Sequence, residues 1–338
     1  MKLLVTGGAG FIGSNVIHHI IDRPEIERLV NLDCLTYAGH LANLEKIFGH
    51  PKYIFEKVDL RDKPAVLQVV SRHDITHVLH LAAESHVDRS ISEPAGFIHT
   101  NVVGTFHLLE ACRSVWDEDF SGKRFHHVST DEVYGSLGPT GYFTETTPYA
   151  PNSPYSASKA ASDFFVRAYH HTYRLPAVIT HGSNAYGPYQ FPEKLIPVIV
   201  QSVLQRKAIP VYGDGMNVRD WLYVRDYAEA LWQVLIRGRD GETYNIGGHN
   251  EGPNIRIVER ICDLIDELAP HLGGGSRKLI TLVNDRPGHD RRYAMDVSKI
   301  NRELSWTPAY TFERGLRETV QWYVENQKWV ETVKSPKG

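Results

Sequence analysis

The sequence predicts an α/β fold in which a doubly wound parallel sheet is joined to a smaller mixed α/β lobe. Short apolar runs alternate along the chain with segments long enough to form a helix, which is typical of a parallel sheet. A glycine cluster directly follows the first of these runs, and an acidic residue follows the second. With 338 residues, the chain is long enough to form two lobes that share a cleft.

The first predicted element is a strand over residues 2–6, and the glycine cluster separates it from a helix over residues 14–22. Val16, Ile17 and Ile20 recur in that helix at helical spacing. Further apolar runs continue the alternation and are predicted as strands of the same sheet: residues 28–32, 53–57, 77–81, 124–128 and 177–180. Together these elements predict a Rossmann-type sheet.

Two long helices are predicted over residues 101–115 and 155–173. Their apolar side chains fit either the protein core or a dimer contact, and the sequence alone favours the core. After Pro188 the chain becomes rich in proline and in glycine turns, which indicates shorter elements. We therefore predict a first domain mainly over residues 1–187 and a second lobe mainly over residues 188–330, a division that allows the chain to cross back to the first domain.

Composition excludes several classes of function. The formal net charge of −3 offers no excess of Lys and Arg for binding nucleic acid. Cys34, Cys112 and Cys262 are odd in number and far apart, which argues against a disulfide framework and a cysteine metal site. The 18 histidines show no metal-ligand spacing with carboxylates, so no metal is predicted. No apolar run of about 18 residues and no signal peptide is found, so we expect a cytoplasmic protein without membrane contact.

The spacing of glycines in the first turn predicts a dinucleotide site. Gly8, Gly10 and Gly13 form a G-x-G-x-x-G pattern, and Gly7 adds a second register. Glycine at these positions lets the backbone approach a pyrophosphate, and the start of the following helix stabilises the negative charge. The alternative is a glycine turn without a ligand, but the strand before it and the helix after it favour the dinucleotide site.

Residues at the ends of later strands are predicted to line the same crevice. Asp33 lies about 20 residues after Gly13, where a carboxylate accepts hydrogen bonds from ribose hydroxyls and disfavours a 2′-phosphate. NAD is therefore predicted in preference to NADP. Asp59 and Leu60 follow the third strand and residues 81–83 end the fourth, although Asp59 could equally be a solvated loop residue.

Tyr155 and Lys159 form a candidate catalytic pair. They are four residues apart at the start of a predicted helix, so both project from one face. An adjacent ammonium group is expected to lower the pKa of the phenol, and a tyrosinate can take the proton of a sugar hydroxyl while hydride leaves the same carbon. Two surface residues are the alternative, which the upstream glycine motif disfavours.

The chain resembles the extended short-chain dehydrogenase/reductase superfamily through residues 6–13, Asp33, Asp59, the Tyr155/Lys159 pair and residues 184–188. Residues 129–135, Ser-Thr-Asp-Glu-Val-Tyr-Gly, are similar to the signature of nucleotide-sugar 4,6-dehydratases, in particular the dTDP-glucose 4,6-dehydratase family. The resemblance extends over nearly the whole chain. It implies an NAD-dependent hydro-lyase in deoxysugar biosynthesis, and by analogy a homodimer formed through the two long helices.

The resemblance also implies a mechanism. Tyr155 takes the proton of the C4 hydroxyl as NAD accepts the C4 hydride, with Lys159 and Thr130 assisting. The resulting ketone acidifies the C5 proton, so Glu132 removes it while a protonated Asp131 gives a proton to the departing C6 hydroxyl. Hydride then returns to C6 and gives a 4-keto-6-deoxy sugar. An ordinary acidic turn is the alternative for the carboxyl pair.

The residues of two binding sites follow from the same resemblance, and arginine forks among them suit a diphosphate. The implied cofactor residues are Gly7, Gly10, Phe11, Ile12, Gly13, Asp33, Leu35, Thr36, Asp59, Leu60, Leu81, Ala82, Ala83, Ser85, Thr100, Tyr155, Lys159 and Ala185. The implied substrate residues are Ser85, Thr130, Asn184, Glu193, Lys194, Leu195, Pro210, Tyr212, Arg219, Asn254, Arg286, His289 and Tyr293.

One segment departs from the family pattern. The family usually reads Thr-Asn-Cys-Ser-Asn-Asn-Tyr-Gly where residues 180–187 read Thr-His-Gly-Ser-Asn-Ala-Tyr-Gly. His181 and Gly182 therefore indicate either a changed packing contact, which we favour, or a preference for another sugar or base. The functional alternatives are a nucleotide-sugar 4-epimerase, a 4,6-dehydratase for a UDP-, GDP- or CDP-sugar, and a silent NAD-sensing protein.

Overall fold

The structure is a computed structural model that describes residues 1–117, 119–285 and 287–335. Its main sheet has seven strands, all parallel, in the order β10-β6-β5-β4-β1-β2-β3. The strands are β1 (Lys2–Thr6), β2 (Arg28–Leu32), β3 (Tyr53–Glu56), β4 (His77–His80), β5 (Arg124–Thr130), β6 (Ala177–Gly182) and β10 (Thr243–Ile246). The predicted doubly wound parallel sheet is confirmed.

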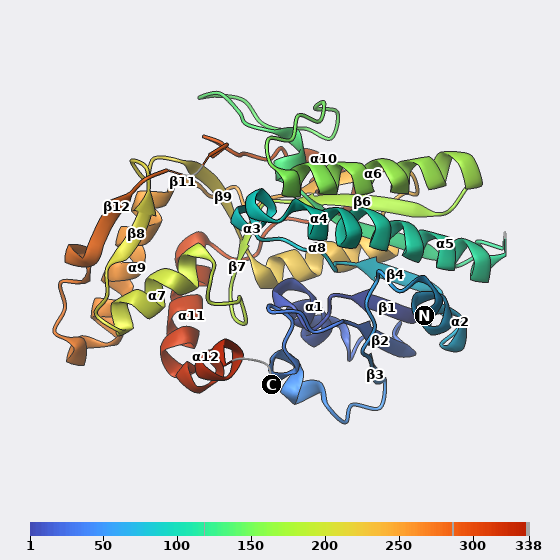
Figure 1. Cartoon of the computed structure of the whole chain (residues 1–338), viewed down its shortest axis with the longest axis horizontal. Helices are drawn as coiled ribbons and strands as arrows, with labels where there is room; N and C mark the ends of the chain where they lie inside the picture. Colours follow the sequence, from blue (N-terminus) through green and yellow to red (C-terminus); the bar gives the residue numbers. More distant parts are fainter. Residues whose placement is uncertain (118, 286, 336–338) are drawn as a thin grey trace.

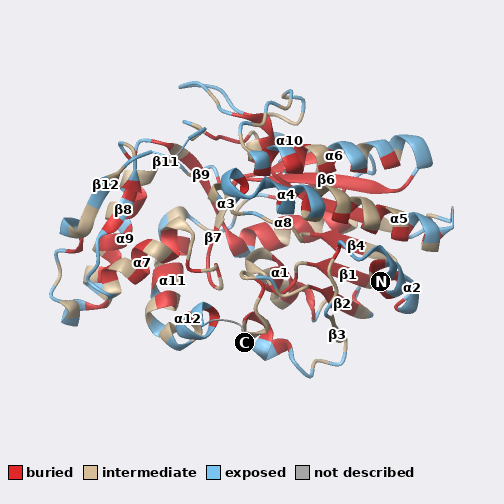
Figure 2. Cartoon of the chain, in the orientation of Figure 1, coloured by how far each residue is buried: buried red, intermediate tan, exposed pale blue. Residues whose placement is uncertain are grey.

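Helices cover both faces of this sheet because its strands are apolar on both sides. Leu3 and Val5 of β1 belong to one core cluster, whereas Leu4 between them belongs to another, as the alternation of a strand requires. The helices on the first face are α1 (Phe11–Ile20) and α8 (Val224–Arg237). Those on the second face are α2 (Lys63–Arg72), α5 (Thr105–Trp116) and α6 (Pro154–Tyr173). The strands and inner helix faces are buried, and the outer helix faces are exposed (Figure 2).

The two long predicted helices are present with different starts. The helix predicted over 101–115 begins as a π-helical segment, Ile98–Gly104, and continues as α5. Gly104 packs closely on Leu60 there, since a Cβ on Gly104 would lie 2.9 Å from Leu60 Cβ. The second helix, α6, begins one residue before the predicted start, because Ser153 forms a capping box and Pro154 occupies the first turn.

The second lobe lies to the left of the main sheet in Figure 1 and surrounds a third core cluster. Its helices are α7 (Leu195–Leu204), α9 (Asn254–Leu268), α11 (Phe312–Glu325) and α12 (Gln327–Lys334), and its paired strands are β8 (Ile209–Tyr212) and β12 (Ile280–Val283). A three-stranded sheet contains β11 (Glu251–Pro253), β9 (Val218–Tyr223) and β7 (Asn184–Tyr186). The shorter helical elements are α3 (Val87–Ser92), α4 (Pro94–Phe97), α10 (Ser298–Leu304), η1 (Leu41–Ile47), η3 (Asp131–Tyr134), η4 (Pro270–Leu272) and η5 (Ser276–Leu279).

The chain after residue 188 contributes to both parts of the molecule. Helix α8 packs against α1, and β10 pairs with β6 at the edge of the main sheet. The division at residues 187 and 188 remains a prediction. No helix within the described ranges is long and apolar enough to cross a membrane.

Candidate active site

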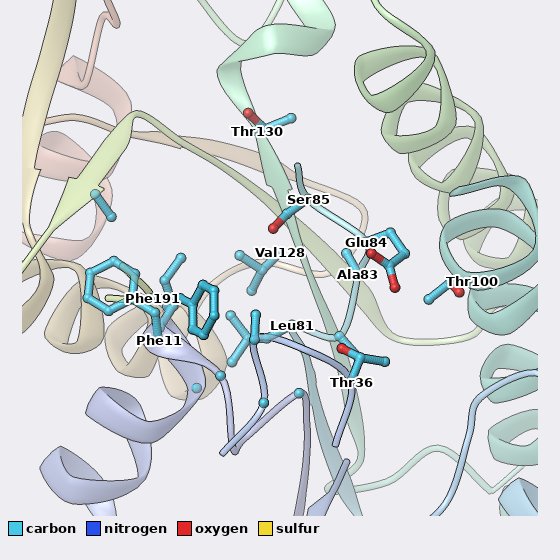
Figure 3. Close-up of a pocket in the computed structure, with 18 of the residues that line it drawn as sticks. Phe11, Thr36, Leu81, Ala83, Glu84, Ser85, Thr100, Val128, Thr130 and Phe191 are labelled. Carbon is cyan, nitrogen blue, oxygen red and sulfur yellow. The ribbon is translucent and has the colours of Figure 1, made fainter. Parts of the chain in front are cut away.

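A cavity of about 330 Å³ opens at the carboxyl ends of the central strands, where the strand order reverses on either side of β1. Crevices of this kind are the usual ligand sites of doubly wound sheets. Phe11 and Phe191 lie on one side of the cavity, Glu84 and Thr100 lie on the other, and Thr130 lies at one end (Figure 3). Residues from both lobes line it, so a ligand would contact both.

The loop between β1 and α1 fits a pyrophosphate. Gly7 has a φ of 71°, and a Cβ there would lie 2.7 Å from Ala82 Cα. A Cβ on Gly13 would lie 2.3 Å from the Gly7 carbonyl oxygen, so a side chain would force the loop open. Helix α1 begins at Phe11, and its N-cap, Gly10, has no side chain that could occupy the helix start. The backbone amides of the first turn can therefore face an anion.

Two aspartates lie on the wall that follows this loop. Asp33 accepts hydrogen bonds from the Ala9 amide at 3.0 Å and the Leu35 amide at 2.8 Å, which fix its carboxylate at the cavity. Asp59 binds the Arg61 guanidinium at 2.6 to 3.0 Å, and this hydrogen bonding lowers the pKa of Asp59 below its usual range. The Asp59 carboxyl is thus held in the charged form, and the Asp33 carboxyl is held in place, so both can accept hydrogen bonds from a nucleoside.

The candidate carboxyl pair follows β5 without a break. Asp131 and Glu132 open the short helix η3, and both line the cavity. The Thr130 hydroxyl caps this helix: it accepts from the Glu132 amide at 3.3 Å and donates to Asp131 Oδ1 at 3.2 Å. The strand end therefore places a hydroxyl and two carboxyl groups side by side.

Tyr155 and Lys159 reach the same place from α6. Both residues line the cavity, and the Tyr155 hydroxyl hydrogen-bonds with Thr130. Lys159 Nζ donates to the Val128 carbonyl at 2.9 Å, which holds the ammonium group against β5. The structure thus brings together the five predicted catalytic residues: Thr130, Asp131, Glu132, Tyr155 and Lys159.

The protein chain by itself does not lower the pKa of Tyr155 as predicted. Burial raises the pKa of Tyr155 well above its usual value, the charge of Glu132 raises it further, and the hydrogen bond with Thr130 opposes both. Burial also lowers the pKa of Lys159 to about 8. A positive charge bound beside Tyr155 would lower its pKa, and the nicotinamide ring of oxidised NAD carries such a charge.

The surroundings of Asp131 favour its protonated form. Burial raises the pKa of Asp131 well above its usual value, the charge of Glu132 adds to this, and the charge of Arg219 opposes it. Within the described part of the chain, Asp131 Oδ2 is buried without a hydrogen-bond partner. A neutral Asp131 beside Glu132 is the combination of acid and base that an elimination needs.

Replacing Asp131 by Asn should stabilise the fold at neutral pH. The pKa of Asp131 is higher in the folded state than in the unfolded chain, so this carboxyl ionises first in the unfolded chain as the pH rises. The free energy of unfolding therefore decreases above the pKa of the carboxyl in the unfolded chain. Asn does not ionise, so the melting temperature of the Asp131→Asn protein should exceed that of the wild type by about 2 to 4 °C at pH 7. Scanning calorimetry at about pH 3.5, where Asp131 is protonated in both states, should show no such gain. A variant less stable than the wild type at pH 7 would contradict a protonated Asp131.

Most of the predicted binding residues also line this cavity. They are Gly7, Gly10, Phe11, Ile12, Gly13, Asp33, Thr36, Asp59, Leu60, Leu81, Ala82, Ala83, Ser85, Thr100, Asn184, Ala185, Glu193 and Lys194. Leu35 is not part of the wall; its φ is 59° and its amide binds Asp33. Lys194 Nζ donates to the Ser85 carbonyl, which connects the start of the second lobe with the loop after β4.

The predicted substrate residues that follow Lys194 and lie within the described part of the chain are outside the cavity wall. Arg219 is buried with its guanidinium 4.2 Å from the centre of the Tyr293 ring, and it donates to the Asp290 carbonyl. The charge of Arg219 acts on Asp131, and that of Glu132 acts on Tyr293, so Arg219 and Tyr293 lie near the carboxyl pair.

The other members of this set are farther along the lobe. Tyr212 and His289 form an edge-on ring contact at 6.2 Å, and Pro210 lies two residues before Tyr212 in β8. Asn254 begins α9, and its Oδ1 is buried without a partner among the described residues. Leu195 begins α7 and packs against the third core. Arg286 lies outside the described residues.

Sequence reasoning missed a buried polar cluster behind Lys159. Asp163 lies one turn further along α6; its carboxylate contacts His127 Nε2 at 3.2 Å and His181 Nε2 at 3.0 Å, and the Ser129 hydroxyl donates to it. Burial alone would raise the pKa of Asp163, but the hydrogen bonds from both histidines lower it well below its usual range. No motif in the sequence connects residues so far apart. His181 is therefore part of a packed polar core, whereas its neighbour Gly182 lines the cavity.

No group of His, Cys, Asp and Glu within the described ranges is arranged to hold a metal ion. The same cavity also includes residues that the sequence analysis did not consider as ligand contacts. They are Leu32, Cys34, Ala38, Gly39, Val58, Glu84, Val128, Ser129, Gly182, Ser183, Gln190, Phe191 and Tyr227. Of these, Gly182 and Tyr227 lie beside the catalytic group and are considered below.

Known proteins similar to this chain share both its length and its fold. The family model described as GDP-mannose 4,6 dehydratase matches residues 4–319. A dTDP-glucose 4,6-dehydratase of Neisseria meningitidis is 57% identical, with 98% of this chain and 96% of the relative covered. The NAD complex of dTDP-glucose 4,6-dehydratase from Bacillus anthracis is 48% identical at a TM-score of 0.88, covering 99% of this chain and 100% of that one. UDP-glucose 4-epimerase of Thermus thermophilus, solved with NAD, is 30% identical at a TM-score of 0.85, covering 96% and 100%.

Proposed function

This chain belongs to the dTDP-glucose 4,6-dehydratase family, and from this premise we infer that it converts dTDP-glucose to dTDP-4-keto-6-deoxy-glucose and water with recycled NAD. It is an NAD-dependent hydro-lyase of the short-chain dehydrogenase/reductase superfamily. One observation carries the dehydration: Asp131 and Glu132 line the same cavity as Tyr155, Lys159 and the glycine loop. An epimerase only oxidises, rotates and reduces its sugar, so it has no use for an acid and a base beside C5 and C6.

NAD fits the first half of the cavity. The glycine loop offers amides to a pyrophosphate, and Asp33 offers a fixed carboxylate to the adenosine ribose, where it disfavours a 2′-phosphate. When bound, NAD accepts a hydride from C4 of the sugar and returns it to C6. The residues that we propose to hold it are those of the cofactor set that line the cavity.

The chain's own residues supply the proton transfers. Tyr155 takes the proton of the C4 hydroxyl, and Thr130 orients that phenol through its hydrogen bond. Glu132 then removes the C5 proton, and the C5–H electron pair forms the C5=C6 bond as the C6–O bond breaks. Asp131 gives its proton to the leaving oxygen, which departs as water. Glu132 returns its proton to C5 when C6 receives the hydride, and Lys159 stabilises the negative charge of the tyrosinate that begins the reaction. Tyr155 has then gained one proton and Asp131 has lost one, and proton exchange with water restores both residues.

The nucleotide end of the substrate is assigned to the second lobe. Lys194 and Arg219 carry positive charge near the start of this lobe, which suits a diphosphate. Tyr212 is exposed and contacts the His289 ring edge-on, and a base could stack on the Tyr212 ring. In this arrangement the sugar lies at Asp131, and the base lies outside the cavity wall.

We also propose a cytoplasmic homodimer. The three cysteines are all unpaired, which supports a reducing compartment. Phe165 of α6 is 40% exposed and packs against Phe106 of α5, and Ile98 beside them is 52% exposed. Apolar side chains exposed together in this way mark a surface that another protein covers.

Phe165→Glu should therefore convert the dimer to a monomer. A charge placed in an apolar interface loses its hydration, and the cost exceeds the contribution of a few side chains to binding. Light scattering after size-exclusion chromatography measures the mass directly. Phe48→Glu replaces an equally exposed aromatic side chain elsewhere and should leave the mass unchanged. A Phe165→Glu protein that remains dimeric would exclude this face as the interface.

The proposed reaction is tested by incubating the purified protein with dTDP-glucose without any added reductant. We expect the alkali-induced absorbance of a 4-keto-6-deoxy sugar. Parallel incubations with UDP-, GDP- and CDP-glucose distinguish a different base preference from a different reaction. A 4-epimer as the sole product would establish an epimerase, and no reaction with any sugar nucleotide would favour an NAD-sensing protein.

A further inference from the structure

Gly182, one of the departures from the family pattern, makes room for a tyrosine. It ends β6 and lines the cavity. A Cβ on Gly182 would lie 2.1 Å from Tyr227 Oη and 2.5 Å from Tyr227 Cζ, so the phenol occupies the space that a side chain at 182 would take. The departure is therefore coupled to a second residue: only glycine at 182 lets Tyr227 lie where it does.

Tyr227 has no role in the reaction as described so far. It lies in the first turn of α8, is 2% exposed, and lines the cavity together with Asp131 and Tyr155. Its hydroxyl makes no hydrogen bond with any residue that the structure describes, which is unusual for a buried phenol. The oxygen touches Gly182 at the cavity wall, so its partner is water or a ligand in the cavity.

The position of Tyr227 relates it to the elimination step, in which Asp131 protonates the leaving oxygen. The charge of Asp131 acts on Tyr227, and Tyr227 in turn acts on Tyr155, so the phenol lies near both residues. Asp131 Oδ1 is already bound to the Thr130 hydroxyl, while Oδ2 is buried without a partner within the described ranges. Asp131, which protonates the leaving oxygen, and Tyr227 therefore each have an oxygen without a hydrogen-bond partner among the described residues. Both residues line the cavity.

We propose that Tyr227 contacts the substrate and donates a hydrogen bond to the oxygen that leaves C6, beside the proton donor Asp131. Tyr227 keeps its own proton: Asp131 supplies the proton, and the phenol stabilises negative charge as the C6–O bond breaks. This inference rests on the proposed dehydration. It assigns to the Gly182 departure a function in elimination in addition to a packing contact.

Tyr227→Phe tests this assignment, because it removes the oxygen and keeps the ring. We expect kcat with dTDP-glucose to fall about tenfold with KM changed less than about twofold, since the lost hydrogen bond forms mainly in the transition state. Oxidation at C4 does not need Tyr227, so the fraction of enzyme holding NADH during turnover should rise. Stopped-flow absorbance at 340 nm measures that fraction. A purely structural role would leave it unchanged.

Gly182→Ala tests whether residue 182 controls the position of Tyr227, and it leaves the tyrosine itself in the sequence. The added Cβ should displace Tyr227 and give the same rise in NADH as Tyr227→Phe. The double variant should be no slower than the slower single variant, because both changes remove one contact. Tyr244→Phe is the control: its hydroxyl binds Glu303 and is not part of the cavity wall, so the NADH fraction should equal that of the wild type.

Two results would overturn the proposal. One is a Tyr227→Phe enzyme whose NADH fraction equals or falls below that of the wild type, and the other is a rise in KM with kcat unchanged. Both results are read against a wild type that makes the expected product, and that product is measured separately. If the wild type forms no 4-keto-6-deoxy sugar, it is the dehydration that fails, and the proposal about Tyr227 fails with it.

Discussion

Glu132→Gln is expected to form product about 1,000-fold more slowly than the wild type while it still oxidises the sugar at C4. Glutamine keeps the size of the side chain but cannot accept the C5 proton, so elimination stops after the ketone has formed. NADH should therefore accumulate on the enzyme and be visible at 340 nm. In deuterated water, the C5 proton of the bound sugar should no longer exchange with solvent.

Glu229→Gln is a matched control for this variant. Glu229 also lies on an element of the first domain, but it binds Arg23 and His19 away from the cavity wall. The Glu229→Gln enzyme should form product at the wild-type rate. If Glu132→Gln formed product within tenfold of the wild-type rate, or still exchanged the C5 proton, another residue would be the base.

Tyr155→Phe should lose both signals, with product formation and NADH formation reduced together by about 1,000-fold. The phenol oxygen is the group placed to take the C4 hydroxyl proton, and hydride cannot leave C4 while that proton remains. The measurements are the same as for Glu132→Gln, so the two variants separate oxidation from elimination. NAD affinity, measured by fluorescence titration, should be retained because the glycine loop and Asp33 are untouched.

The reverse pattern would contradict the role of Tyr155. A Tyr155→Phe enzyme that accumulates NADH would place the first proton transfer on another residue of the cavity. Lys159 is the nearest candidate, since burial lowers its pKa to about 8 and its neutral form can accept a proton. The pH profile of NADH formation in Tyr155→Phe would then rise toward pH 8.

Local patterns were sufficient to predict the sheet and the chemistry. The glycine loop, Asp33, residues 130–132 and the Tyr155/Lys159 pair are each short in sequence and each follow a strand or open a helix. The carboxyl ends of parallel strands meet at one edge of a sheet, so recognising the strands already indicated that these residues converge. The start of the helix before α5 was not predicted, because no local pattern indicated the π-helical segment Ile98–Gly104.

The residues that the sequence did not reveal depend on contacts between distant segments. Asp163, His127 and His181 come from α6, β5 and β6, and only the fold makes them one buried cluster. The pKa of Tyr155 is another case: the spacing to Lys159 predicted a lowered value, but burial and the charge of Glu132 raise it in the chain by itself. Electrostatics depends on every group nearby and on solvent, which spacing along one helix cannot represent.

The sequence by itself determined the fold class, the cofactor and the reaction, because each of these depends on residue types at short spacings in a known order of strands and helices. The tertiary structure alone decided which residues share the cavity, how burial sets their proton affinities, and that β10 returns to the first sheet. It also paired Gly182 with Tyr227, two residues that are adjacent only because β6 and α8 pack together. The physical reason is that the spacing of residue types is a local property of the chain, whereas burial and contact depend on how the whole chain packs.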